Sequence, residues 1–341
     1  MASKNDETPK RFRTHANYLR AFSLLIPSAT GGRDLEPLRA RFKDTPAMTG
    51  ACVDPTAVFK SLQMAWRTEL LIDFTSAAFE DDELVRVANS WAVVQVYYIL
   101  YHATQAFAQA RGQSRTPNHP QTQNIFKSHW SDRAIDLPPW SLSRDRSTVR
   151  NGSKEIQIED VHAWVTCSES TKWSLAAKAL RTTRDDAVAK AMDAKRQQLL
   201  TERKKQRNQH ETTRLKTGQK VRAKPLIALP RLSEAEKSSI DARVRAYTMM
   251  DYLYRLRIRT NYEDSAIFTD GPVDDNESLQ VRRSLRRISS STLMIHELAV
   301  ADLLGPATVV SQARSFLKAS VPERSETALA RRLHLIDAHR G

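Results

Sequence analysis

The chain has 341 residues, and its 53 Lys and Arg outnumber 39 Asp and Glu, which gives a formal charge of +14 at pH 7. The only cysteines, Cys52 and Cys167, lie far apart, which argues against a disulfide framework and a structural zinc site. No segment approaches the roughly 20 apolar residues of a membrane span, and the N-terminus lacks the apolar core of a signal peptide. We therefore expect a cytoplasmic protein without a membrane partner.

The positive charge creates a field that attracts polyanions, and nucleic acid is the first candidate. An acidic membrane surface, an acidic protein, or an arginine-rich composition without functional meaning are the alternatives. Gly is scarce, with 9 residues, which favours helices over strands.

Apolar residues at three- and four-residue spacing predict most of the helices. In chain order, residues 1–16 are expected to be disordered and 18–26 to form a short apolar segment. In the helix expected at 83–111, the stripe that includes Leu84, Val87 and Trp91 is predicted to face the core. The long helices are expected at 56–79, 83–111, 173–207, 233–268 and 277–304, and shorter ones at 34–42, 123–130, 308–319 and 325–338.

Two local signals refine this outline. Asn151-Gly152 lies between alternating segments at 148–150 and 155–158, which predicts a small β-hairpin. Ser233 and Glu236 have the spacing of a capping box, which begins the helix that runs to Phe268.

The predicted fold is mainly all-α, a four-helix bundle with a mixed, partly irregular insertion. The divisions expected are an N-terminal tail with short helices (1–55), the first half of the bundle (56–112), the insertion (113–234), the second half of the bundle (235–304) and C-terminal short helices (305–341).

The segment 246–268 is predicted to be one uninterrupted helix with a row of guanidinium groups. At helical spacing Arg255, Arg259 and Tyr262 share one face, and Arg257 and Asn261 share the next. Guanidinium groups suit phosphate because they are always charged and donate two parallel hydrogen bonds. The alternative is that these arginines pair with Asp and Glu on a solvated face.

Two motifs resemble the HEPN superfamily of helical domains. Residues 91–112 contain Tyr97, Tyr98, Tyr101, His102 and the helix-ending Gly112, similar to a conserved first helix, and His119 follows where members often have a His. Residues 256–264 are similar to the superfamily's R-x-x-A-D-Y helix, with Asn261 in the Asp position. The resemblance covers about 56–112 and 235–304.

This resemblance implies an all-α bundle, often dimeric, that frequently binds RNA. Many members are metal-independent endoribonucleases of toxin, antiphage or RNA-processing systems, in which Arg and His of an R-x(4–6)-H motif cut RNA. In this chain no His lies four to six residues after Arg255, Arg257 or Arg259. The matching spacings Arg203–His210 and Arg332–His339 lie outside the expected bundle core.

His102, Arg259 and Tyr262 are the expected catalytic residues, with His102 transferring a proton if the bundle brings it to the arginines. The alternative is that His102 is a hydrogen-bonded core residue. Arg255, Arg257 and Asn261 are expected to bind RNA. His119, His129 and Asp132 do not have the spacing of a standard metal site, and no Gly-rich phosphate loop is present, so neither a metal nor a cofactor is expected.

The segment 181–224 contains fourteen Lys and Arg against five Asp and Glu. Its later part, 206–224, is predicted to be a mobile basic loop. It lacks aromatic residues for base stacking, so phosphate contacts are expected from Arg196, Arg203, Lys204, Lys205 and Arg207. The alternative is a solvated helix and linker.

The sequence thus favours a homodimeric, HEPN-like RNA-binding protein that acts as a metal-independent endoribonuclease in a toxin or antiphage-defence system, with DNA as a second nucleic-acid partner. The alternatives are a non-catalytic helical scaffold that binds nucleic acid or another partner, and an adaptor without nucleic acid.

Overall fold

The structure is a computed structural model that describes residues 7–28, 35–52, 54–78, 82–133, 135–218, 228–264, 266–321 and 326–339. The chain divides into two compact units, one formed by Met1–Leu180 with Tyr247–Gly341 and the other by Arg181–Ala246. Each unit is described by itself. Among the described residues, no helix is both long and apolar enough to cross a membrane.

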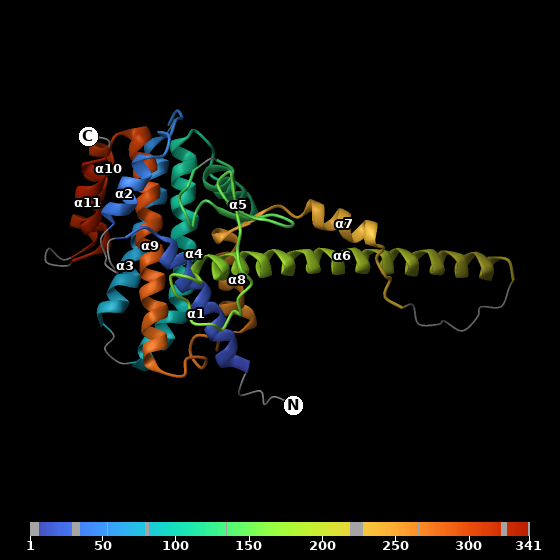
Figure 1. Cartoon of the computed structure of the whole chain (residues 1–341). Helices are drawn as coiled ribbons and strands as arrows, with labels where there is room; N and C mark the ends of the chain where they lie inside the picture. The colour runs from blue at the N-terminus through green and yellow to red at the C-terminus, as the bar shows by residue number, and fades with distance from the viewer. Residues whose placement is uncertain are drawn as a thin grey trace. The chain divides into compact units, whose positions relative to one another are not determined.

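Helices dominate the first unit, which confirms the mainly all-α class (Figure 1). α4 (Asp82–Ala110) packs against α3 (Pro55–Ala78) on one side and against α9 (Asp275–Leu304) on another. Around this centre lie α1 (Glu7–Leu25), α2 (Glu36–Lys43), α5 (His119–Phe126), α8 (Met249–Ile258), α10 (Pro306–Ser320) and α11 (Ala328–Asp337).

Local signals explain the limits of α9. The Asp274 side chain accepts a hydrogen bond from the Glu277 backbone N–H at 2.8 Å and so caps the N-terminus. At the other end Gly305 has a φ of 87°, a left-handed conformation that glycine adopts at little cost. The residues between them bury an apolar face that includes Leu285, Leu293 and Leu298.

The predicted hairpin is present, within a larger sheet. β2 (Val149–Asn151) and β3 (Lys154–Ile156) pair antiparallel, with Asn151 opposite Lys154. β1 (Leu142–Arg144) and β4 (Tyr247–Thr248) extend the sheet in the order β3-β2-β1-β4. Gly152 has a φ of 58°, and a Cβ there would lie 2.5 Å from the Ile135 carbonyl oxygen, so both conformation and space require glycine.

The single helix predicted for 246–268 is wrong. Tyr247 and Thr248 pair with β1, and the Asp251 carboxylate then accepts a hydrogen bond from the Thr248 backbone N–H at 2.8 Å, at the start of α8. α8 ends at Ile258 and continues as the π-helical turn η3 (Arg259–Glu263). The preceding helix, α7 (Glu234–Arg243), has the predicted Ser233–Glu236 capping box but stops before the strand.

Two expectations of disorder are also wrong. Residues 7–16 belong to α1, because Phe12 is a buried apolar residue within the polar sequence and packs edge-on against Phe268 at 5.9 Å. Residues 1–6 of that prediction lie outside the described residues. α6 (Lys172–Lys216) continues through the basic stretch predicted to be a loop from 206. Its Gln, Lys and Arg residues favour helix without needing an apolar stripe. Residues 219–224 of that prediction lie outside the described residues.

The apolar stripe predicted to line the core of α4 is partly exposed. Leu84, Val87 and Trp91 are 45%, 48% and 63% exposed, whereas Val85 and Val93 are buried. The helix is therefore rotated by about one residue relative to the prediction in its first half. On the neighbouring helix α3, Leu71 and Phe74 are also exposed.

A buried ionic network joins α3, α9 and α11. Arg332 donates to Glu69 at 2.7 and 2.9 Å and to Glu297 at 2.8 Å, and the Trp66 indole N–H donates to Glu297 at 2.8 Å. The two carboxylates and the guanidinium are 4% exposed or less. The R-x(6)-H spacing of Arg332 and His339 is thus structural here, since Arg332 is fully engaged in the core.

Candidate active site and nucleic-acid interface

Aromatic rings from three elements gather beside one arginine. α4 contributes three tyrosines and one histidine from neighbouring helical turns. α5 contributes its first residue, a histidine, and α8 contributes one tyrosine and the arginine. Because α4 packs against both α5 and α8, residues distant in sequence become neighbours. This group, called the Tyr–His cluster below, consists of Tyr97, Tyr98, Tyr101, His102, His119, Tyr254 and Arg257.

Arg257 lies over the rings of the cluster. Its guanidinium carbon is 5.1 Å from the Tyr98 ring centroid, 5.6 Å from Tyr97 and 5.7 Å from Tyr254. These are cation–π distances, which hold the guanidinium without neutralising its charge. Within the described part of the chain no carboxylate lies within 4.0 Å of Arg257, and its buried Nε has no hydrogen-bond partner. The donors of Arg257 are therefore available to an incoming anion.

His119 packs against the tyrosines of the cluster. Its Nδ1 lies 2.7 Å from the Tyr97 hydroxyl, and its ring centroid lies 5.0 Å from Tyr101 and 5.3 Å from Tyr254. Burial and, secondly, the charge of Arg257 lower the pKa of His119. At neutral pH the ring is thus uncharged, the state that accepts a proton. If Nδ1–H donates to Tyr97, then Nε2 is the basic nitrogen.

Tyr97 supports this hydrogen bond. Burial raises the pKa of Tyr97 well above its ordinary value, and the charge of Arg257 only partly opposes that shift. The phenol therefore stays protonated across the physiological pH range and can pair with either tautomer of the imidazole.

His102 lies on the other edge of the cluster. It stacks on Tyr98 with ring centroids 6.2 Å apart and meets Tyr101 edge-on at 5.3 Å. Burial, and secondly the charge of Arg115, lower the pKa of His102 to about 4. The cluster thus combines two neutral imidazoles with one unneutralised guanidinium, the components for moving a proton beside a phosphate.

The other predicted residues of segment 246–268 lie elsewhere. Arg259 contacts His15 of α1, with Nη1 and Nε2 3.4 Å apart, and Arg255 pairs with Glu263 at 2.5 Å. Tyr262 is 74% exposed, and Asn261 beside it is half-buried. The contacts of His102 with Tyr98 and Tyr101 place it near Arg257, whereas Arg259 and Tyr262 belong to η3.

The basic residues predicted on α6 belong to the second unit. Arg203, Lys204 and Lys205 are exposed and form no ion pair with the described residues. Arg196 pairs with Asp193 at 2.7 Å, and Arg207 lies 4.0 Å from Glu211. The buried anchor of this unit is Arg184, which donates to Asp241 at 2.7 Å and thereby ties α6 to α7. One helix thus presents a row of cations to solvent.

No family model, curated protein or solved structure matches this chain. The chemistry of the candidate site is therefore interpreted from its own geometry.

Proposed function

We propose that this chain is an HEPN-like RNA-binding protein that cleaves RNA without a metal ion at the Tyr–His cluster. The observation that supports this most strongly is Arg257, a guanidinium that forms no ion pair with the described residues and lies beside the neutral imidazole of His119. The HEPN-like assignment and the role in a toxin or antiphage-defence system rest on the resemblance of residues 91–112 and 256–264.

In the proposed reaction Arg257 binds the non-bridging oxygens of one phosphodiester. Nε2 of His119 takes the proton of the adjacent ribose 2′-hydroxyl, and the 2′-oxygen bonds to phosphorus as the bond from phosphorus to the 5′-oxygen breaks. The departing 5′-oxygen receives the proton back from the imidazolium of His119. The products are a 2′,3′-cyclic phosphate and a 5′-hydroxyl end.

The sequence motif R-x(4–6)-H is not needed for this arrangement. Arg257 comes from α8 and His119 from the start of α5, and both helices pack on α4. Tyr98, which is half-buried, is further suited to stack on a base, because aromatic faces bind bases of any sequence. The exposed cations of α6 would add sequence-tolerant affinity for phosphates.

The second candidate is a non-catalytic nucleic-acid-binding scaffold. It is favoured by the exposed row of Arg203, Lys204 and Lys205, which needs no catalytic site to bind phosphates. This candidate predicts binding of RNA and DNA alike, with affinity that falls steeply as salt is added.

Incubation with labelled tRNA, single-stranded RNA and duplex DNA, in EDTA and about 150 mM salt, separates the candidates. At this salt concentration long-range charge attraction between protein and nucleic acid is largely screened, so non-specific binding through net charge is reduced. We expect RNA fragments and intact DNA. Intact RNA with a salt-sensitive gel shift would leave the scaffold as the better account. An absence of both cleavage and shift would contradict both candidates and favour an adaptor that binds no nucleic acid.

We further propose that two copies of the chain associate through the exposed apolar residues of α3 and α4. Leu71 and Phe74 on one helix and Val87 and Trp91 on the next are 39–63% exposed. Such a surface can pair with itself about a two-fold axis.

Trp91→Lys is expected to convert the dimer to a monomer in light scattering. Trp164→Lys is the matched control, because Trp164 is 59% exposed but belongs to neither helix and follows Ala163, whose carbonyl oxygen accepts a hydrogen bond from Asn17 of α1. A wild-type monomer, or equal effects of both substitutions, would contradict this interface.

A further inference from the structure

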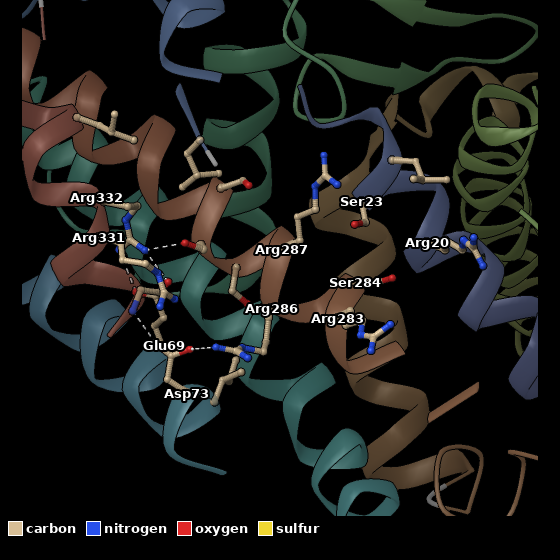
Figure 2. A pocket seen from close by; sticks show the side chains of 18 of the residues that line it. Arg20, Ser23, Glu69, Asp73, Arg283, Ser284, Arg286, Arg287, Arg331 and Arg332 are labelled. Carbon is tan, nitrogen blue, oxygen red and sulfur yellow. Dashed lines mark hydrogen bonds and ion pairs between the residues drawn. The ribbon is translucent and has the colours of Figure 1, made fainter. Parts of the chain in front are cut away.

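A second region of the first unit has an unneutralised positive charge. A cavity of about 1000 Å³ extends along α9 and is also lined by α1, α3 and α11 (Figure 2). It shares no residue with the Tyr–His cluster. Its lining contains several arginines and serines, namely Arg20, Arg283, Arg286, Arg287, Arg331, Arg332, Ser23, Ser284, Ser289, Ser290 and Ser291.

The carboxylates that line the cavity are already engaged on the α3 side. Glu69 accepts from the buried Arg332, and Asp73 pairs with Arg286 at 2.9 Å. Asp73 also accepts a hydrogen bond from the Ala328 backbone N–H at 2.8 Å. This side of the cavity is therefore electrically balanced and structural.

The α1 side is not balanced. Figure 2 shows Arg20, Arg283 and Arg287 away from the two ion pairs, close to Ser23 and Ser284. Arg20 donates to the neutral Gln280 amide oxygen at 2.6 Å. Arg287 donates to the Ile26 carbonyl oxygen and the Ser28 hydroxyl, both at 2.7 Å, which are neutral acceptors too.

Arg283 is the most available of the three guanidinium groups. It is exposed and has no hydrogen bond or ion pair with the described residues. It precedes Arg287 by four residues, so both project from the same face of α9. Burial lowers the pKa of Arg287, and the charge of Glu169 partly opposes this, but no carboxylate of the described residues forms an ion pair with it. A half-buried guanidinium whose direct contacts are all to neutral groups is costly, and a bound anion would lower that cost.

We infer that the α1 side of this cavity binds a small molecule that carries two or more phosphate groups. Three guanidinium groups from two helices match the several oxygens of a polyphosphate, and the Ser23 hydroxyl of α1 adds a neutral donor. The volume is that of a site for one small ligand rather than of a groove for an extended strand. A nucleoside triphosphate and an inorganic triphosphate share this chemistry.

Calorimetric titration of the full chain with inorganic triphosphate, ATP and orthophosphate, without RNA, tests the inference. We expect one saturable site per chain for triphosphate and ATP and much weaker binding of orthophosphate. Tighter binding of ATP would mean that the nucleoside contributes, and equal binding would mean that the phosphates alone are recognised. An absence of saturable binding would overturn the inference.

Arg283→Glu is expected to weaken triphosphate binding by about tenfold or more, equivalent to about 1.4 kcal/mol. Arg314→Glu is the matched control, because Arg314 is an exposed arginine of α10 outside the cavity lining. Arg20→Gln, which removes a second guanidinium of the site, should also weaken triphosphate binding. If Arg283→Glu and Arg314→Glu weaken triphosphate binding equally, the effect depends only on the net charge of the protein, and this result would overturn the proposed site. Arg257→Ala should leave triphosphate binding unchanged, which separates this site from the proposed ribonuclease site.

Discussion

Arg257→Ala is expected to lower the rate of RNA cleavage by about 10²–10³-fold, the usual cost of removing one group that stabilises transition-state charge. The physical reason is that the Arg257 guanidinium is the cation that the described residues place over the tyrosine rings of the cluster, at 5.1–5.7 Å from their centroids. Arg257→Lys should recover only part of the rate, since an ammonium keeps the charge but lacks the planar fork. Single-turnover cleavage of a labelled RNA measures the effect.

Arg255→Ala is the matched control for this prediction. Arg255 lies two residues earlier on α8, but Glu263 already neutralises it through an ion pair of 2.5 Å. Its removal should change the cleavage rate by about twofold or less, because partly exposed ion pairs contribute little. Equal losses in the two variants would mean that general positive charge, rather than the placement of Arg257, supports the reaction.

Arg332→Met is expected to lower the free energy of unfolding by about 3–5 kcal/mol, because it leaves two buried carboxylates without their partner. Glu69 and Glu297 are 4% and 0% exposed at the side chain, so solvent cannot replace the guanidinium. Methionine keeps much of the side-chain volume, and the loss should therefore reflect charge rather than a cavity. Urea denaturation followed by circular dichroism measures it.

The pH dependence of the free energy of unfolding of this variant tests whether the buried carboxylates cause the loss. Burial raises the pKa of Glu69, and Arg332 opposes that shift in the wild type. Without Arg332 the folded-state pKa of Glu69 lies further above its unfolded value of about 4.5. Because the pKa of Glu69 is higher in the folded than in the unfolded state, the free energy of unfolding is highest below the unfolded pKa, where Glu69 is protonated in both states. It decreases as the pH rises through the folded-state pKa. The difference between wild type and Arg332→Met should therefore be larger at pH 8 than at pH 5.

Arg13→Met is the control for the ionic network. Arg13 pairs with Glu277 at 2.9 Å, but its side chain is 48% exposed. Its loss should cost about 1 kcal/mol or less. A similar small loss in Arg332→Met, independent of pH, would contradict a stabilising role of the buried network.

Periodicity in the sequence predicts the helices that build the first unit. α3, α4 and α9 bury enough apolar residues at three- and four-residue steps for their limits to be predicted closely, and Asn151-Gly152 marks the hairpin. β1 and β4 are not predicted because they have only three and two residues. β4 is a strand only through its pairing with β1, about a hundred residues earlier in the chain. A short strand without alternating burial leaves no local pattern.

The candidate site is predictable only in part, for a similar reason. The row of arginines indicates phosphate binding, but the sequence does not show that Glu263 neutralises Arg255 or that Arg259 turns toward His15. Arg257 differs from them through the tyrosines of α4, which lie more than 150 residues away in the chain. In the sequence, His119 is marked only by its position after Gly112, where members of the HEPN superfamily often have a His. Its hydrogen bond to Tyr97 depends on the packing of α5 against α4, which no local pattern predicts.

The most direct test of the proposed function is the chemistry of the ends formed when the protein cuts a defined RNA in EDTA. Wild type and His119→Gln should be compared on one RNA and on the same strand with 2′-deoxy substitution. We predict 2′,3′-cyclic phosphate ends from wild type on the unsubstituted RNA alone, and a rate at least about 10²-fold lower for His119→Gln, as expected when a general base is removed. RNA that stays intact with wild type, or cleavage that persists on the 2′-deoxy strand, would contradict the proposed ribonuclease.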